Sequence, residues 1–249
     1  MRKLLSAGVA LAALSVGSAV AADLGRPPVY RRPSPPPAPV FTWSGCYIGG
    51  HIGGGYAWTE STNAVNTTAF GDFVPGQGFA NHSSGVVGGG HVGCNIQVSS
   101  RMVWGIEGSY AGADIERDYV SAFGGADDVY TNRISDIASV TGRLGTAFDN
   151  WLFYTKVGWA AGRAHLSVVD NIAPAGAGSA SNWHNGFTLG SGVDVAFSRN
   201  WILGFESNYY RFESKSYEIG GGAGLYTFNS RPRDVFTYVG RVTWKFDVY

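Results

Sequence analysis

The stretch Val235–Phe246, VFTYVGRVTWKF, alternates apolar and polar residues with a period of two. One side of this ribbon carries Phe236, Tyr238, Val242, Trp244 and Phe246, and the other carries Thr237, Arg241, Thr243 and Lys245. Strict alternation over about ten residues predicts a β-strand with two chemically different faces. A strand that crosses a bilayer needs about 9–11 residues and turns apolar side chains to lipid and polar ones to the lumen. The stretch therefore predicts a strand of a membrane barrel.

The composition of the chain agrees with a membrane protein built from strands. The 249 residues carry no formal net charge, and 14% of them are charged, against about a quarter in an average soluble domain. Aromatic residues also make up 14%, and 37 residues are glycine. No apolar run after residue 22 reaches the ~20 residues of a transmembrane helix. The charge balance gives no reason to expect nucleic-acid binding.

The first 40 residues divide into two segments that do not belong to the barrel. Residues 1–22 are predicted to be a secretory signal peptide, with Arg2 and Lys3 before an apolar stretch and the small residues of a cleavage site at 19–21. Residues 23–40 hold seven of the ten prolines and predict an extended periplasmic linker. The arginines of the linker could contact anionic cell-wall polymer, and the alternative is a solvated spacer. The barrel domain is assigned to residues 41–249.

Seven further alternating segments precede the last strand. They are Gly45–Trp58, Gly85–Gln97, Met102–Asp114, Ile134–Phe148, Trp151–Ser167, Trp183–Phe197 and Trp201–Phe212. Their connections alternate between long (59–84, 115–133, 168–182, 213–234) and tight (98–101, 149–150, 198–200). Outer-membrane barrels have short periplasmic turns and long extracellular loops. The predicted fold is therefore all-β, an eight-stranded antiparallel transmembrane β-barrel with four long extracellular loops and both termini in the periplasm.

A soluble barrel of the lipocalin kind would turn the same apolar faces inward. The signal peptide, the loop asymmetry and the tryptophans at strand ends favour lipid on the outside, because Trp and Tyr suit membrane interfaces. The tryptophans expected at these interfaces are Trp43, Trp58, Trp104, Trp151, Trp159, Trp183, Trp201 and Trp244.

The segment Phe41–Gly50, FTWSGCYIGG, follows an Ala-Asp-Leu start and is accompanied by GIEG at 105–108, RLG at 143–145 and GSGVD at 190–194. In this order the chain from residue 41 onward resembles the small outer-membrane immunogenic, porin-like proteins of Gram-negative bacteria, which belong with the OmpA-like and opacity-protein eight-stranded barrels. The resemblance implies location in the cell outer membrane, contact with its lipid and lipopolysaccharide, and insertion by the outer-membrane assembly machinery.

Relatives of this kind commonly end on an aromatic residue in phase with the last strand, which the assembly machinery is thought to read. Here Phe246 is in phase and Tyr249 is out of phase by one position. Both are candidates for the assembly signal, and either a short overhang or a bulge would reconcile them.

Cys46 and Cys94 are the only cysteines, in a chain predicted to enter an oxidising compartment. A register that places Cys46 opposite Cys94 in the first hairpin also places Ile48 opposite Val92, which keeps apolar residues on one face. Directly opposed side chains need only a small shift to reach disulfide distance. A Cys46–Cys94 disulfide is predicted, and the alternative is two free, buried thiols.

Seven charged residues share the polar faces of the last six strands: Glu107, Arg143, Lys156, Asp194, Glu206, Arg241 and Lys245. Placing Glu107 opposite Arg143 also pairs Ile106 with Leu144. Side chains just fill an eight-stranded barrel, whereas wide aqueous channels come with about 16–18 strands. We therefore expect these charges to form a network of ion pairs across a closed lumen. The alternative is a narrow water-filled passage in which they do not meet.

No pattern in the chain points to catalysis, a cofactor or a metal. The glycine runs at 53–55 and 88–90 lack the neighbouring helix and Lys-Ser or Lys-Thr of a phosphate loop. The five histidines lack metal-ligand spacing, and none stands with a matching serine and acid. The predicted function is a structural, envelope-stabilising outer-membrane protein, expected to be a monomer and not an enzyme. The alternatives are a narrow porin for small solutes and an adhesin or host-surface binding protein that acts through its loops.

Overall fold

The computed structural model describes residues 41–65, 78–120, 128–170, 177–221 and 224–246. The predicted signal peptide and linker, and Tyr249, lie outside these residues. The strands are β1 (Gly45–Val65), β2 (Gly78–Gln97), β3 (Met102–Val120), β4 (Asp128–Phe148), β5 (Trp151–Asp170), β6 (Gly178–Ala196), β7 (Trp201–Phe212), β8 (Lys215–Gly221) and β9 (Gly224–Phe246). A search of the same residues finds no helix long and apolar enough to cross a membrane.

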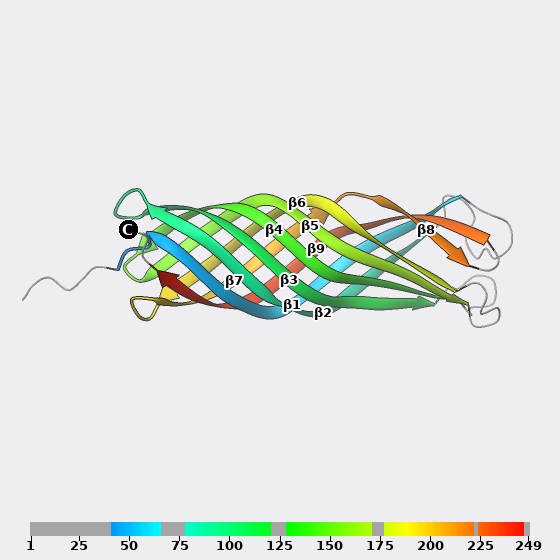
Figure 1. The fold of residues 1–249 in the computed structure, drawn as a ribbon, viewed down its shortest axis with the longest axis horizontal. Helices are drawn as coiled ribbons and strands as arrows, with labels where there is room; N and C mark the ends of the chain where they lie inside the picture. The colour runs from blue at the N-terminus through cyan, green and yellow to red at the C-terminus, as the bar shows by residue number, and fades with distance from the viewer. Residues whose placement is uncertain (1–40, 66–77, 121–127, 171–176, 222–223, 247–249) are drawn as a thin grey trace, which may run out of the picture. The chain divides into compact units, whose positions relative to one another are not determined.

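The nine strands form one antiparallel sheet that closes on itself. The order is β1-β2-β3-β4-β5-β6-β7-β9-β8, and β1 also pairs with β9, which closes the ring. Strands β7 and β8 follow one another along the same side of β9. The ring therefore has eight positions, with the seventh occupied first by β7 and then by β8 (Figure 1). The predicted eight-stranded barrel is confirmed, and the interruption of its seventh strand is new.

The strands are longer than the alternation predicted. Strand β1 has 21 residues and β9 has 23, so the sheet runs through most of the segments expected to be loops. The ladder between β3 and β4, for example, continues to Val120 opposite Val129. An antiparallel ladder satisfies backbone groups in water as well as in lipid. The predicted boundaries followed the apolar face and stopped where that face becomes polar, although the strands go on.

Tight turns join β2 to β3, β4 to β5 and β6 to β7 at the end of the barrel where β1 begins and β9 ends (Figure 1). The turn between β4 and β5 consists of Asp149 and Asn150, and Asp149 has a φ of 52°. Asp and Asn tolerate this left-handed conformation better than most residues, and two-residue hairpins require it. The alternation of short and long connections predicted from the sequence is present.

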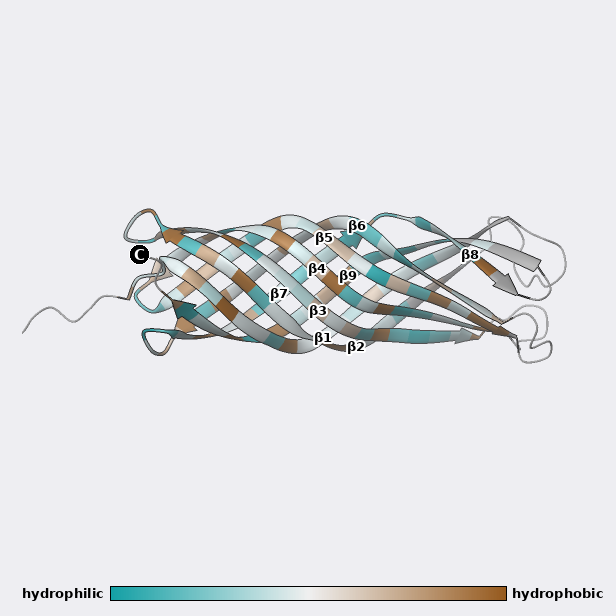
Figure 2. Ribbon diagram, viewed as in Figure 1, coloured by the Kyte–Doolittle hydropathy of each residue, from teal (hydrophilic) through white to brown (hydrophobic). Residues whose placement is uncertain are grey.

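The outer surface of the barrel carries an apolar band, as predicted. Hydrophobic and hydrophilic residues alternate along the strands (Figure 2), and the apolar ones face outward: Ile52 is 73% exposed, whereas Glu107 is 1% exposed. Seven of the eight tryptophans also face outward: Trp58, Trp104, Trp151, Trp159, Trp183, Trp201 and Trp244. These positions suit the two membrane interfaces.

Trp43 is the exception, and its predicted place at the interface was wrong. Its side chain is 1% exposed and lies inside the barrel, in a cluster with Val103, Leu152 and Ile202. Phe41 packs edge-on against it with 4.9 Å between ring centres. Trp43 precedes β1, so the in-and-out alternation of that strand does not fix its direction. It packs inside the barrel at the end that carries the tight turns.

Candidate functional site: a charged layer across the lumen

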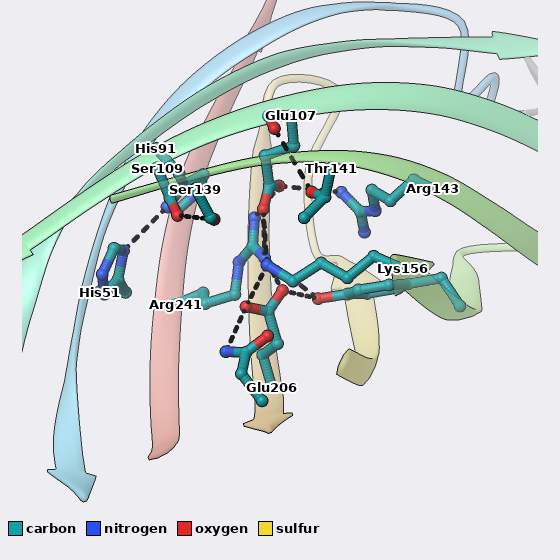
Figure 3. Close-up of polar contacts among 12 residues, drawn as sticks. His51, His91, Glu107, Ser109, Ser139, Thr141, Arg143, Lys156, Glu206 and Arg241 are labelled. Atoms are coloured by element: carbon teal, nitrogen blue, oxygen red, sulfur yellow. Dashed lines mark hydrogen bonds and ion pairs between the residues drawn. The ribbon is translucent and has the colours of Figure 1, made fainter. Parts of the chain in front are cut away.

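Glu107 of β3 is the centre of a group of charged side chains inside the barrel (Figure 3). Its Oε2 lies 2.6 Å from Arg241 Nη2 and 3.5 Å from Arg143 Nη1. Its Oε1 lies 3.1 Å from Lys156 Nζ. Tyr47 of β1 donates its hydroxyl to Oε2 at 3.0 Å. Side chains from β1, β4, β5 and β9 therefore converge on one buried carboxylate.

Two further carboxylates balance the charge. Glu206 of β7 accepts from Lys156 Nζ at 2.7 Å and also forms an ion pair with Arg241. Asp194 of β6 accepts from Arg143 Nη2 at 2.5 Å. Three acids thus meet three bases in a layer where every one of the six residues is at most 5% exposed. Such balance is required because an unpaired charge is costly to hold away from water.

Two tyrosines complete the layer and were not among the residues predicted for it. Tyr154 of β5 donates to Glu206 Oε2 at 2.8 Å, and the Arg143 guanidinium lies 3.6 Å from the centre of its ring. A guanidinium over an aromatic face is favourable, especially when both are desolvated. Tyr154 alternates in phase with Lys156, which places it inside. Phase alone does not reveal which inward residues meet across the barrel.

The predicted register between β3 and β4 was wrong by two residues. Arg143 stands opposite Gly105, and Glu107 stands opposite Thr141. A shift of two leaves every side chain on its predicted face, so the apolar pattern does not distinguish the two registers. The long Arg143 side chain reaches Glu107 diagonally, so the predicted ion pair forms despite the shift.

Lys245 lies in a different layer from the other six predicted charges. Its side chain is buried, and its Nζ is 5.6 Å from the centre of the Phe41 ring, near the end with the tight turns. The other six residues meet at the level of Glu107.

Apolar layers lie on both sides of the charged layer. Toward the tight turns, Trp43, Val103, Leu152 and neighbouring residues form one cluster. On the other side Val87, Ile115, Ile137, Phe212, Val235 and others form a second. These inward apolar residues were not expected in a polar lumen. A cavity of about 20 Å³ beside Glu107 has room for roughly one water molecule.

Two histidines of the lumen contact one another near the charged layer. His51 Nδ1 lies 3.3 Å from His91 Nδ1, and His91 Nε2 lies 2.8 Å from Thr243 Oγ1. Within the described residues, no group of three His, Cys, Asp or Glu side chains is placed to hold a metal ion.

Ser135, Asp136 and His165 meet on the outside of the barrel at a β-bulge of β4. Ser135 Oγ donates to Asp136 Oδ2 at 2.5 Å and lies 3.0 Å from His165 Nε2. A hydrolase triad needs the carboxylate on the second imidazole nitrogen, where it orients the base. Here the carboxylate holds the serine instead, so the group lacks the order Ser–His–acid.

Cys46 and Cys94 form a disulfide and stand directly opposite one another in the ladder between β1 and β2. Ile48 is opposite Val92, as predicted. The predicted pairing and its register are confirmed.

Strand β6 and strand β8 meet without a regular ladder at the end of the barrel away from the tight turns. His184 Nδ1 lies 2.8 Å from the Glu213 carbonyl, and its Nε2 lies 2.6 Å from the Tyr217 hydroxyl. Asn182 Nδ2 donates to the Ser216 carbonyl at 3.1 Å. Burial raises the pKa of the Tyr217 phenol, so the hydroxyl keeps its proton well above neutral pH. Side chains therefore supplement the single backbone hydrogen bond from the Glu213 amide to the Asn185 carbonyl at this seam.

A closed antiparallel ring with an apolar exterior and paired charges inside is a β-barrel suited to a membrane. The family model described as an outer membrane protein beta-barrel domain matches residues 9–235, and the chain belongs to this family. The protein is accordingly located in the outer membrane.

Named relatives agree with this assignment. The 31 kDa outer-membrane immunogenic protein of Brucella melitensis is 29% identical over 208 residues, which cover 80% of this chain and 83% of the relative. The 22 kDa outer membrane protein of Rhizobium leguminosarum is 27% identical over 190 residues, covering 76% and 73%. Among solved structures, OprG of Pseudomonas aeruginosa has a TM-score of 0.47 at 10% identity, covering 84% of this chain and 99% of OprG.

Proposed function

We propose that this protein is a structural component of the outer membrane and that its barrel is a closed scaffold, not an open channel. The observation that supports this function is the charge-balanced layer around Glu107, in which six buried side chains from β3 to β9 contact one another across the lumen. Removing one partner of such a buried pair typically costs about 3–5 kcal/mol. An ion that crossed the layer would have to displace these partners.

The apolar clusters on both sides of this layer add to the barrier. A hydrated ion would lose water at Trp43 before it reached Glu107, and again at Phe212 beyond it. Loss of hydration without new ligands is costly for any ion. The narrow porin is therefore less favoured than the closed scaffold.

Single-channel recording tests the proposal. The refolded protein, inserted in a planar bilayer, should show no steady conductance in symmetric KCl, while a 16-stranded porin prepared in the same way shows full steps. A stable open level in most insertions of the unmutated protein would overturn the closed scaffold and favour a pore.

A second function, binding at the cell surface, is supported by the length of the strands. We place the tight turns in the periplasm, so that the other end of the barrel rises above the outer leaflet. Its outer face there carries ion pairs such as Arg233–Glu60 at 2.8 Å and Arg133–Asp114 at 2.9 Å. A rigid raised rim of this kind suits the presentation of the connecting segments to a binding partner.

Replacing 66–77 or 121–127 by short Gly-Ser connections tests this second function. Bacteria that display the unmutated protein should adhere to cultured host cells more than bacteria that display the shortened forms. Equal adhesion at equal surface amounts would exclude these two segments and overturn the proposal.

A further inference from the structure

The wall of the barrel is interrupted where β7 passes into β8. The ladder between β6 and β7 ends at Gly186 opposite Phe212. The pairing of β7 with β9 ends at Tyr210, and that of β8 with β9 begins at Lys215. Residues 211–214 therefore have no ladder partner on β9, and residues 213–214 have none on β6 either. Around Glu213 the wall is held by single contacts, such as the Glu213 amide donating to the Asn185 carbonyl at 2.8 Å.

An open groove of about 600 Å³ lies on the outer surface at this interruption. Its apolar part is formed by Trp159 and Phe187, which stand opposite one another on β5 and β6 and are 50% and 48% exposed. These two rings belong to the lipid-facing surface. The groove is thus continuous with the apolar band of the barrel.

The polar part of the groove is formed by Arg211 and Arg231, together with Asn185 and Glu213. Arg211 is the direct cross-strand neighbour of Phe187. Arg231 donates its Nε to the Phe212 carbonyl at 3.0 Å, which fixes the plane of its guanidinium. Among the described residues, ion pairs engage Arg133, Arg143, Arg233 and Arg241 but neither arginine of the groove. Arg211 does have a neutral partner, the Tyr209 hydroxyl, to which it is hydrogen-bonded.

Two guanidinium groups and an exposed aromatic pair that line one groove present the chemistry that recognises an anionic amphiphile. Arg binds phosphate through two parallel N–H donors, and basic pockets at a membrane surface attract anionic head groups. Glu213 would repel an anion if it stood alone, so the site favours a head group that both arginines reach at once.

We propose that this groove binds the phosphate-bearing head group of an outer-leaflet glycolipid, with an acyl chain of the same lipid against Trp159 and Phe187. The inference rests on the orientation proposed above, in which this end of the barrel faces outward. It does not depend on whether the lumen is closed. Bound lipid would also cover the place where the ladders of the wall are interrupted.

The test compares lipid retention by the refolded full-length barrel in detergent, measured by native mass spectrometry with bis-phosphorylated lipid A as the probe. The variant Arg211→Gln/Arg231→Gln should bind about 30-fold more weakly and each single variant about fivefold more weakly. The matched control is Arg101→Gln/Arg199→Gln, which makes the same charge change on exposed residues at the opposite end of the barrel. This control should retain the lipid as the unmutated protein does.

Three comparisons on the unmutated protein keep the test decisive even where a variant folds poorly. Dephosphorylated lipid A should be retained at least tenfold less, which would support recognition of phosphate. Displacement of lipid A by inorganic phosphate at low millimolar concentration would overturn the need for an acyl chain. Equal retention of phosphatidylglycerol would overturn the assignment to an outer-leaflet glycolipid. Equal loss of lipid in the groove variant and in the control would show general charge attraction only.

Discussion

Glu107 forms ion pairs with more partners than any other residue of the charged layer. It contacts Arg143, Lys156 and Arg241 and accepts a hydrogen bond from Tyr47. Neutralising it leaves two acids to balance three bases in a dry environment. Loss of one partner therefore affects three others at once.

Glu107→Gln should accordingly lower the free energy of unfolding by about 3–5 kcal/mol. Glu116→Gln is the matched control on the same strand, because Glu116 forms an exposed ion pair with Arg133. Exposed pairs contribute about 0–1 kcal/mol. Urea unfolding in lipid vesicles, followed by tryptophan fluorescence, measures both. Equal effects of the two substitutions would contradict a buried hub at Glu107.

The distances also rank the partners of Glu107. Arg241 approaches its carboxylate to 2.6 Å and Arg143 only to 3.5 Å, and Arg143 has a second acid in Asp194. Double-mutant cycles to alanine should therefore give a coupling energy of about 2–3 kcal/mol for Glu107 with Arg241, and about 1 kcal/mol for Glu107 with Arg143. Each double variant should cost less than the sum of its singles. Additive effects in both cycles would mean that the charges do not act together.

Substitution of Trp43 tests whether the charged layer blocks the lumen without the apolar layer near the tight turns. Trp43→Ala removes a fully buried ring from the cluster near the tight turns and should cost about 3–5 kcal/mol of stability. The charged layer is left intact, so bilayer recordings of this variant should still show no steady conductance. The appearance of regular open steps would show that Trp43, and not the charged layer, blocks the lumen.

At the scale of single elements, the first hairpin combines a ladder with a covalent link. The disulfide joins Cys46 to Cys94, 48 residues apart in sequence. Cross-links over loops of this length typically stabilise by about 2–4 kcal/mol, mainly by restricting the unfolded chain. Cys46→Ser/Cys94→Ser should therefore lower stability by this amount and leave the folded barrel able to form.

Alkylation provides the direct measurement of this link. Protein denatured without reductant should incorporate no thiol reagent, and protein treated with reductant should incorporate two equivalents. Two reactive thiols before reduction would contradict the disulfide.

The elements show what alternation can and cannot predict. It gives the face of each residue, and Ile48, Val92 and Glu107 all lie on the side expected. It does not give strand ends, because the ladder continues when the outer face becomes polar. The division of β7 from β8 was also missed, since residues 213–234 lack a continuous apolar face. Pro232, which cannot donate to a neighbouring strand, was the one local signal of irregularity there.

At the scale of the whole barrel, the candidate site was predictable as a set of residues but not as an arrangement. Six of the seven predicted charges meet, because inward charges in a narrow barrel must be neutralised. The place of Lys245 depends on height along the barrel, which is fixed by the relative shift of neighbouring strands. The contacts of Tyr47 and Tyr154 could not be predicted for the same reason, since they also depend on height along the barrel. The apolar clusters were missed because a barrel lumen is expected to be lined by polar residues, whereas Val87 and Phe212 are apolar and face inward.

Orientation in the membrane is the property of the whole barrel on which surface binding and the proposed glycolipid groove depend. Placing the tight turns in the periplasm puts Ser99 on the periplasmic side of the membrane and Glu218 of β8 on the cell surface. Both residues are exposed to solvent. Because Cys46 and Cys94 are joined, a cysteine introduced at either position would be the single reactive thiol. A maleimide reagent too large to cross the outer membrane should label Glu218→Cys on intact cells and label Ser99→Cys only after lysis. The reverse pattern would show that the barrel is inserted the other way, and the groove beside Arg211 would then face the inner leaflet.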